Sequence, residues 1–241
     1  MSRKPKPKAP AAPRPRRRLL ARLRRPFRIF LWVALALLLW PVAYRWVNPP
    51  VTYLIASEWA RRGDVEREWR DLDEISPDMA RAVMGGEDAR FCEHYGFDFV
   101  EIRKALEEDD RRRGASTISQ QVAKNVFLWP DASWLRKGLE AGYTILIELT
   151  WPKARIMEVY LNVAEMGPGV FGAEAAAQRW FGKPAAELTL GEASRIAAIL
   201  PNPRERSAAR PSAYVQRRAR AIAAGADTLR AEGRADCVAP R

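Results

Sequence analysis

An uncharged apolar run near the N-terminus constrains this chain more than any other feature. It extends from Ile29 to Tyr44, between Arg28 and Arg45. As a helix it would be ~24 Å long, slightly shorter than the ~30 Å hydrocarbon core of a bilayer, and flanking apolar residues can lengthen it. A buried core helix could be as long, but the basic block before it and the aromatic residues around it favour a transmembrane helix over residues 29–47. No small-x-small site follows, which argues against a cleaved signal peptide.

Positive charge is concentrated before this run. Of the 41 Lys and Arg residues, 12 lie in residues 1–28, where there is no acid, so the remainder of the chain is formally neutral. An excess of basic residues marks the cytoplasmic side of a span. The N-terminus is therefore expected in the cytoplasm, and everything after the span in the periplasm, outside the inner membrane. A neutral outer part has no basic surface for nucleic acid, which we exclude as a partner.

Composition divides the rest of the chain into three segments. Residues 1–28 are rich in Pro, Lys, Arg and Ala, cannot bury a core, and are expected to be a disordered basic cytoplasmic tail. Residues 48–75 begin with Asn48-Pro49-Pro50, which favours extended backbone, and are expected to be a juxtamembrane linker. Residues 76–241 are long enough for one globular domain.

Helical signals dominate residues 76–241. Ser76-Pro77 is a typical helix start, and Thr189 begins a capping-box pattern. No alternating strand pattern is longer than a few residues, and there is no internal repeat. The predicted fold class is mainly α.

The two cysteines, Cys92 and Cys237, are too few for a disulfide framework. They could be paired or free even in an oxidising compartment. The sequence favours two free thiols.

Two adjacent acids stand at the predicted end of the first helix of this domain. Glu87 and Asp88 follow a pair of glycines, and negative charge at a helix C-terminus opposes the helix dipole without evident structural benefit. On these residues alone, surface acids and a functional site remain equally open. His94 is the only histidine, so neither a site of several histidines for zinc nor a Ser-His triad can be built. A hydrogen-bonded core histidine is the simplest interpretation.

A helix predicted from Ser116 carries one polar face. Thr117, Gln121 and Lys124 lie at i, i+4 and i+7, while an apolar stripe points elsewhere. A hydroxyl, an amide and an ammonium group suit a sugar or phosphate ligand, although a solvated helix face would contain the same residue types.

Two later segments contain charged pairs at helical spacing. Arg136 and Glu140 are four residues apart, as in a helical ion pair worth ~0.2–0.5 kcal/mol. Glu158 and Asn162 share a helix face, and we expect them to have a structural role in bridging to other helices.

These segments, in this order, resemble the family 51 glycosyltransferases, the peptidoglycan glycosyltransferase domain of class A penicillin-binding proteins. The similarity extends from Ser76 to Pro203 and comprises EDARFCEHYG, GASTISQQVAKN, RKGLE, KARIMEVYLN, FGAEAAAQRWF and ILPNP. Neither Ser-x-x-Lys nor Lys-Thr-Gly occurs. The resemblance is therefore to monofunctional members without transpeptidase activity.

The resemblance implies a lysozyme-like glycosyltransferase head with a small membrane-associated jaw, and a mobile region between Gly96 and Gly114 beside the cleft. It implies an inverting reaction in which lipid II extends a lipid-linked glycan strand and polyprenyl diphosphate leaves. Glu87 matches the general base of the family, and Glu140 matches a second essential acid near the diphosphate. The implied partners are lipid II, the growing strand and the membrane, with cell-wall synthesis or divisome proteins as further candidates.

The other matching positions are expected to bind substrate: Asp88, Phe91, His94, Ser116, Thr117, Gln120, Gln121, Lys124, Asn125, Arg136 and Lys137. The three basic residues among them would neutralise the diphosphate. No cofactor is required and no protein metal site is expected, although a divalent cation, Mg²⁺ or Mn²⁺, could join at the diphosphate. Ala132 stands where many relatives have an Arg, which would shift diphosphate binding toward Lys124 and Arg136.

Two other functions would use a similar cleft. A lysozyme-like hydrolase would use two carboxylates to transfer sugar to water, and a non-catalytic wall-binding protein would hold finished strands. The basic residues beside the acids favour a diphosphate donor over a neutral glycan.

Overall fold

The computed structural model describes residues 15–107 and 116–239, with the backbone alone for residues 15–24 and 105–106. It divides into two units, Met1–Trp40 and Pro41–Arg241. Most described residues are helical, as predicted, and the few strands are short.

The N-terminal unit contains most of α1 (Pro15–Ala43). Its part from Arg25 to Ala43 is long and apolar enough to cross a membrane. The helix begins at Pro15 rather than near Ile29, so residues 15–28 are helical where we expected a disordered tail. Leu, Arg and Ala, which are good helix formers, dominate this stretch, and the helix continues through Pro26 into the apolar run. Residues 1–14 of the expected tail lie outside the described residues.

The expected linker is folded. Residues 48–75 contain α2 (Tyr53–Arg62), β1 (Glu66–Arg67) and the 3₁₀ helix η1 (Leu72–Glu74). The Thr52 hydroxyl accepts the backbone N–H of Ile55 at 3.3 Å and caps α2. These elements are too short to give a periodic pattern, and the burial of Ile55 fixes α2 to the rest of the unit.

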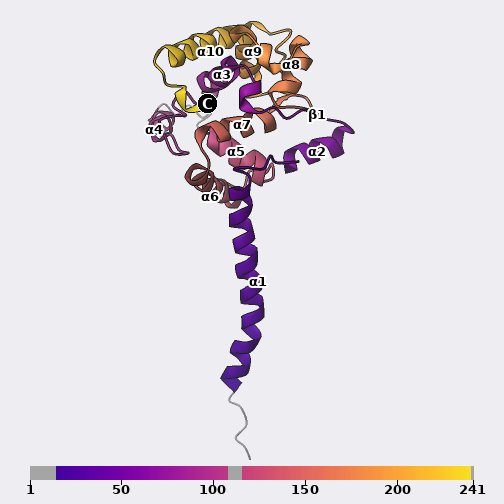
Figure 1. The fold of residues 1–241 in the computed structure, drawn as a ribbon, viewed down its shortest axis with the longest axis vertical. Helices are drawn as coiled ribbons and strands as arrows, with labels where there is room; N and C mark the ends of the chain where they lie inside the picture. The colour runs from indigo at the N-terminus through magenta and orange to yellow at the C-terminus, as the bar shows by residue number, and fades with distance from the viewer. Residues whose placement is uncertain (1–14, 108–115, 240–241) are drawn as a thin grey trace, which may run out of the picture. The chain divides into compact units, whose positions relative to one another are not determined.

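Helices form the remainder of the second unit (Figure 1). They are α3 (Pro77–Glu87), α4 (Phe99–Glu107), α5 (Ile118–Phe127), α6 (Trp134–Thr150), α7 (Lys153–Val163), α8 (Ala173–Phe181), α9 (Leu190–Ile199) and α10 (Ala213–Ala231), with short 3₁₀ helices η2 (Ala185–Glu187) and η3 (Asp236–Val238). The strands β2 (Glu165–Gly167) and β3 (Val170–Phe171) join β1 in a sheet of order β1-β3-β2, in which β3 pairs parallel with β1 and antiparallel with β2.

The predicted helix starts are confirmed. Thr189 and Glu192 form the capping box of α9. The first helix of the domain starts at Pro77 after Ser76, but the Ser76 hydroxyl donates to the carbonyl of Leu188 at 2.8 Å instead of capping it.

Asn162 has the expected structural role, with a different partner. Its side chain accepts the N–H of Arg70 at 2.9 Å and donates to the carbonyl of Arg70 at 2.8 Å, so it ties α7 to the segment before α3 rather than to another helix. Glu158 pairs with Arg155 on the same helix.

Helices α3, α9 and α10 pack together at one end of this unit, while α5 packs against α6 and α7 (Figure 1). At the crossing of α3 and α10 the two backbones touch. A Cβ atom on Gly85 would lie 3.2 Å from the backbone N of Ala226 and 3.2 Å from the carbonyl O of Ile222. Gly225 faces Gly85 from the other helix, with its own Cβ position 3.9 Å from the Gly85 Cα. The crossing therefore has little room beyond glycine at position 85, whereas a methyl group at position 225 would make an ordinary van der Waals contact.

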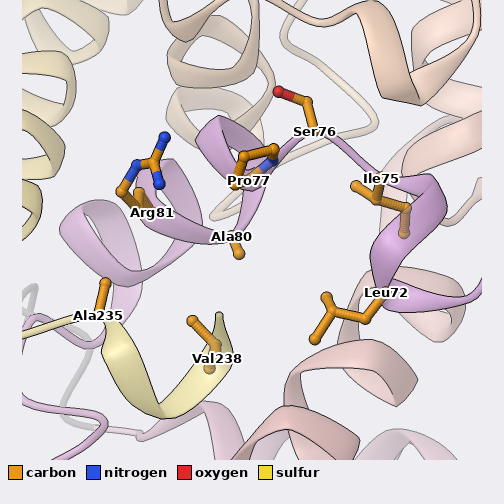
Figure 2. A pocket seen from close by; sticks show the side chains of 8 residues that line it. All are labelled: Leu72, Ile75, Ser76, Pro77, Ala80, Arg81, Ala235 and Val238. Carbon is orange, nitrogen blue, oxygen red and sulfur yellow. The ribbon is translucent and has the colours of Figure 1, made fainter. Parts of the chain in front are cut away.

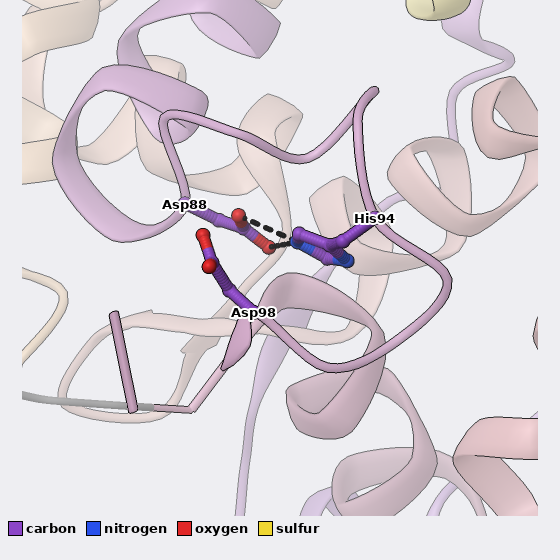
Figure 3. A group of neighbouring side chains, drawn as sticks. All are labelled: Asp88, His94 and Asp98. Carbon is purple, nitrogen blue, oxygen red and sulfur yellow. Dashed lines mark hydrogen bonds and ion pairs between the residues drawn. The ribbon is translucent and has the colours of Figure 1, made fainter. Parts of the chain in front are cut away.

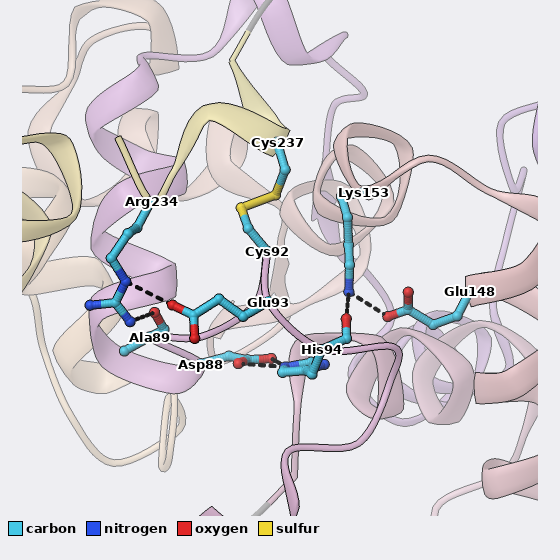
Figure 4. The surroundings of a disulfide bond; sticks show 9 residues. All are labelled: Asp88, Ala89, Cys92, Glu93, His94, Glu148, Lys153, Arg234 and Cys237. Carbon is cyan, nitrogen blue, oxygen red and sulfur yellow. Dashed lines mark hydrogen bonds and ion pairs between the residues drawn. A yellow bond between two sulfur atoms is a disulfide. The ribbon is translucent and has the colours of Figure 1, made fainter. Parts of the chain in front are cut away.

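The expectation of free thiols is wrong, because Cys92 and Cys237 form a disulfide (Figure 4). Their Cα atoms lie 5.7 Å apart although 145 residues separate them in the sequence. The bond ties the loop after α3 to η3, beside an ion pair between Arg234 and Glu93 with Nε–Oε1 of 2.8 Å. Two cysteines this far apart in sequence give no local signal of proximity.

Gly85→Ala is expected to lower the melting temperature, because the added methyl group would meet α10 backbone that cannot rotate aside. Overpacking of this kind costs ~1–3 kcal/mol. Gly142→Ala is the matched control: Gly142 also lies within a helix, and its Cβ position has nothing within 4 Å. That variant should lose no stability and could gain up to ~1 kcal/mol from helix propensity. Thermal unfolding followed by circular dichroism compares the two, and equal melting temperatures would contradict the close crossing.

Candidate active site

Glu87 is the last residue of α3, as the sequence predicts, and its side chain is mostly buried. Gln121 on α5 donates from Nε2 to Glu87 Oε2 at 3.0 Å. Arg218 on α10 places Nη2 3.5 Å from Glu87 Oε1. Burial raises the pKa of Glu87, while Gln121, Arg218 and Lys124 act in the opposite direction. The net result is a raised pKa, the direction that favours acceptance of a proton during catalysis.

Asp88 holds the loop that follows α3. It is buried, and its Oδ2 accepts the backbone N–H of Ile118, the first residue of α5, at 3.0 Å. Its Oδ1 lies 2.9 Å from His94 Nε2 (Figure 3). Because His94 Nδ1 accepts the N–H of Gly96 at 3.2 Å, the proton sits on Nε2 and is donated to Asp88.

Asp98 lies beside this pair, so that one ligand atom from each of Asp88, His94 and Asp98 falls within 4.8 Å of the others (Figure 3). Asp98 Oδ1, however, accepts the N–H groups of Val100 and Glu101 and caps α4. The oxygens and nitrogens of the cluster thus satisfy backbone groups and each other. This arrangement explains the three residues as supports of the loop without a metal ion.

The start of α5 differs from the predicted polar face. Thr117 is the N-cap: its hydroxyl accepts the N–H of Gln120 at 3.2 Å and donates to the carbonyl of Gly96 at 2.7 Å. The side-chain oxygen of Gln120 in turn accepts the backbone N–H of Thr117. Both residues are buried and act within the cap. The Thr-x-x-Gln spacing is that of a capping box, so the sequence alone could have predicted the capping role of Thr117 and Gln120.

The rest of that helix keeps the predicted face. Gln121 contacts Glu87, and its Oε1 accepts the hydroxyl of Tyr160 at 3.3 Å. Ser116 is exposed just before the cap. The expected mobile region between Gly96 and Gly114 contains α4, and its residues 108–114 lie outside the described part of the chain.

Lys124, one turn beyond Gln121, interacts electrostatically with both predicted catalytic acids, Glu87 and Glu140. Burial lowers the pKa of Lys124, as do the charges of Arg136 and Lys137, whereas Glu140 and Glu87 raise it, with a net lowering. Its ammonium group is therefore within electrostatic reach of both carboxylates.

Glu140 is nearly inaccessible, with 2% of its surface exposed, and both of its oxygens have cationic partners. Arg136 Nη1 lies 2.5 Å from Oε2, and Lys137 donates to Oε1. The spacing of Arg136 and Glu140 suggests an exposed ion pair on one helix, whereas the structure buries Glu140 and adds Lys137 as a second partner. A divalent ion at Glu140 would meet two cations at close range, so the residues present do not fit one there.

Beside these cations lies an open groove of about 440 Å³. Its lining combines basic and polar groups with apolar ones: Lys124, Asn125, Asp131 and Arg136, and Leu54, Leu128, Trp129, Pro130 and Ala132. Such a lining suits an amphiphile with an anionic head.

A second cavity, between η1, α3 and η3, holds about 20 Å³ (Figure 2) and has room for roughly one water molecule, too little for a sugar.

Phe91 is fully buried and therefore supports the site from behind rather than contacting a ligand. Lys153 lies over its ring at 4.4 Å and donates to the carbonyl of His94 at 2.7 Å and to Glu148 Oε1 at 2.8 Å (Figure 4). The sequence reasoning missed Lys153 as a support, and it missed Arg218, which lies among other arginines of α10 with nothing to distinguish it.

The comparisons with known proteins agree with this geometry. The transglycosylase family profile matches residues 55–226. A biosynthetic peptidoglycan transglycosylase of Jannaschia sp. (strain CCS1) is 56% identical over 203 residues, covering 84% of each chain. Proteins of the same name from Rhodospirillum centenum and Pseudomonas aeruginosa are 51% and 50% identical, covering 90% and 81% of this chain and 95% and 88% of their own lengths. This chain therefore belongs to the transglycosylase family.

Proposed function

We propose that this protein polymerises lipid II into β-1,4-linked glycan strands of peptidoglycan, with polyprenyl diphosphate as leaving group. The observation that carries the proposal is a mostly buried carboxylate, Glu87, that interacts electrostatically with Lys124, a residue of the groove in which Lys124 and Arg136 meet apolar side chains. Family membership supports the same reaction.

In the proposed step, Glu87 removes the proton from the 4-hydroxyl of lipid II as that oxygen attacks the anomeric carbon of the lipid-linked strand. The new C–O bond forms while the bond from the anomeric carbon to the diphosphate oxygen breaks, which converts an α linkage to a β linkage. The proton ends on Glu87 and the electron pair on the diphosphate. Lys124 and Arg136 stabilise that negative charge, and Gln121 holds Glu87 through the bond to Oε2.

Glu140 acts in this scheme as a positioning residue. Its carboxylate holds Arg136 and Lys137, and it balances the charge of Lys124. A hydrolase of the lysozyme type needs a second carboxylate that can reach the sugar. A carboxylate that is 2% exposed and paired on both oxygens is poorly placed for that task, which favours transfer from a diphosphate over hydrolysis.

We also propose that α6 is part of a membrane-associated jaw. Large apolar side chains are exposed along it: Trp134, Leu135, Ile145 and Leu149. The Trp151 indole donates to the carbonyl of Pro41 at 2.9 Å, and Arg155 donates to the carbonyl of Tyr44. The α6–α7 junction is thus attached to Pro41 at the end of the candidate span and to Tyr44 just after it, which supports a place for α6 near the bilayer.

The catalytic part is proposed to lie in the periplasm, with α1 spanning the inner membrane and the N-terminus in the cytoplasm. Two independent observations support this orientation. Basic residues precede the apolar run, and the disulfide between Cys92 and Cys237 belongs in an oxidising compartment.

Glu87→Gln is expected to reduce polymerisation by roughly 10²–10⁴-fold, because glutamine keeps the size and hydrogen-bonding reach of the side chain but cannot accept the proton. The assay is the conversion of labelled lipid II to strands resolved on a gel. Glu187→Gln, at an exposed carboxylate of η2, is the matched control and should retain full activity. Near wild-type polymerisation by Glu87→Gln, in a fold shown intact by circular dichroism, would rule out this residue as the base.

Lys124→Ala should reduce use of the lipid-linked donor by tenfold or more, since a partly desolvated charge contact is worth ~1.5–3 kcal/mol. Lys124→Arg keeps the positive charge and should lose less. Initial rates at varied lipid II concentration would show the difference. Small and equal effects of both substitutions would mean that the ammonium group does not face the diphosphate.

In protein taken from cells and denatured, Cys92 and Cys237 are expected to resist maleimide labelling until a reductant is added, because both sulfurs are consumed in the disulfide. The measurement is gel-shift alkylation of the denatured protein with and without reduction. Cys92→Ser leaves Cys237 unpaired and serves as the control for reagent access. Labelling of both wild-type cysteines without reductant would remove the disulfide as an argument for the periplasmic side.

A further inference from the structure

Arg218 lies outside the segments on which the sequence resemblance rests, yet it reaches the proposed base. Its Nη2 lies 3.5 Å from Glu87 Oε1 and donates to the carbonyl of Gly86 at 3.1 Å. The same guanidinium nitrogen thus touches both the carboxylate and the backbone one residue before it. Its side chain is 29% exposed, so the contact is partly shielded from water.

The close crossing of α3 and α10 sets this contact. Arg218, Ile222 and Gly225 lie at i, i+4 and i+7 on α10 and therefore share the face that rests on α3. A Cβ atom added to Gly85 would lie 3.2 Å from the carbonyl O of Ile222, and one added to Gly86 would lie 3.1 Å from the Ile222 Cδ1. Because the backbones touch there, Arg218 is delivered to the C-terminal end of α3, where Glu87 lies.

Hydrogen bonds satisfy the Arg218 guanidinium only in part. Its buried Nε has no acceptor among the described residues, and an unsatisfied buried donor reduces stability. An aliphatic side chain of similar length would fill the same space without that loss. Packing alone therefore does not explain why an arginine occupies this position. In the described part of the chain, the only acid with which Arg218 pairs is Glu87.

We propose that Arg218 is a positioning residue that keeps the Glu87 carboxylate charged and fixes its Oε1, opposite the bond that Gln121 makes to Oε2. This inference rests on the proposed function, in which Glu87 is the base. The two contacts hold one oxygen each, from α10 and from α5. The carboxylate can then rotate little between one transfer step and the next.

The charged groups around Glu87 predict in which direction its pKa changes when Arg218 is replaced. Burial raises its pKa; Gln121, Arg218 and Lys124 oppose this, and Asp88 adds to it. Tyr160 on α7, whose own pKa burial raises, also faces the carboxylate but is neutral at working pH. Removal of Arg218 leaves Lys124 as the remaining cation among these groups, so the Glu87 pKa should rise further. Because the base must be ionised, activity is lost as pH falls through that pKa, and the loss would begin at higher pH in the variant.

The test is the pH dependence of kcat/KM for lipid II polymerisation by the full chain in detergent. Arg218→Gln should move the acid limb to higher pH, so that the ratio of the rate at about pH 5.5 to that at about pH 8 falls by roughly threefold or more. Arg218→Lys should restore part of the shift. The matched control is Arg217→Gln, at the adjacent exposed arginine of α10, which should leave the profile unchanged.

A merely structural role would give a different result. It would lower the rate by the same factor at every pH, and that outcome would overturn the proposal. A second measurement adds Arg218→Gln to Glu87→Gln: with no carboxylate left to ionise, the residual rate should fall no further and its pH dependence should not change. If Arg218→Gln fails to fold, the Arg218→Lys profile still decides, since an acid limb at the wild-type position together with a loss at all pH values counts against the proposal.

The same experiment separates this inference from the function it builds on. A wild-type protein that does not polymerise lipid II would refute the proposed function. A wild-type protein that polymerises it, with an acid limb that Arg218→Gln leaves in place, would refute only the role of Arg218.

Discussion

The contact between the backbones of α3 and α10 is the constraint on which the site depends. At Gly85 and Gly225 the two helices approach so closely that a methyl group on Gly85 would lie 3.2 Å from α10 backbone atoms. This approach shields the C-terminal end of α3 from solvent, and Glu87 is the residue that ends it. The same approach brings the Arg218 guanidinium to the carboxylate that it helps to bury. A change in the distance between α3 and α10 would therefore also change the contact between Arg218 and Glu87.

Burying a carboxylate at the end of a helix is unfavourable twice over, through desolvation and through the helix dipole. The fold offsets this with a hydrogen bond from Gln121 and two cations, Arg218 and Lys124, from different helices. Lys124 is itself partly desolvated and is balanced by Glu140, whose oxygens hold Arg136 and Lys137. The charges thus form a continuous set across α3, α5, α6 and α10. A pair within such a set stays favourable only while its neighbours are present, because an unpartnered buried charge is costly.

The loop that follows Glu87 is held from several directions (Figure 4). Asp88 accepts the first N–H of α5, Lys153 donates to the carbonyl of His94, and Cys92 is bonded to Cys237 near the C-terminus. Each attachment comes from a different part of the sequence, and together they keep the loop from moving away from Glu87. Residues that the family resemblance marks as important, such as His94 and Phe91, serve here as supports of the loop.

The sequence by itself determined what depends on neighbours along the chain. The apolar run with its basic flank, the helix starts at Pro77 and Leu190, and the position of two acids at a helix end all follow from local propensity, capping and charge order. The face of α5 that carries Gln121 and Lys124 follows from helical period. The capping role of Thr117, a residue that the family resemblance marks as substrate-binding, also follows from the local spacing of Thr117 and Gln120.

Tertiary structure alone decided which distant residues meet. The disulfide joins residues 145 positions apart, and Arg218 reaches Glu87 from the last long helix. The burial of Glu140, which turns an ordinary helical ion pair into a shielded charge cluster, also depends on packing between helices. Periodicity shows which residues share a face of one helix, but it holds no information about which face of another helix will cover it. That pairing is fixed by side-chain shape, and at Gly85 by the absence of a side chain.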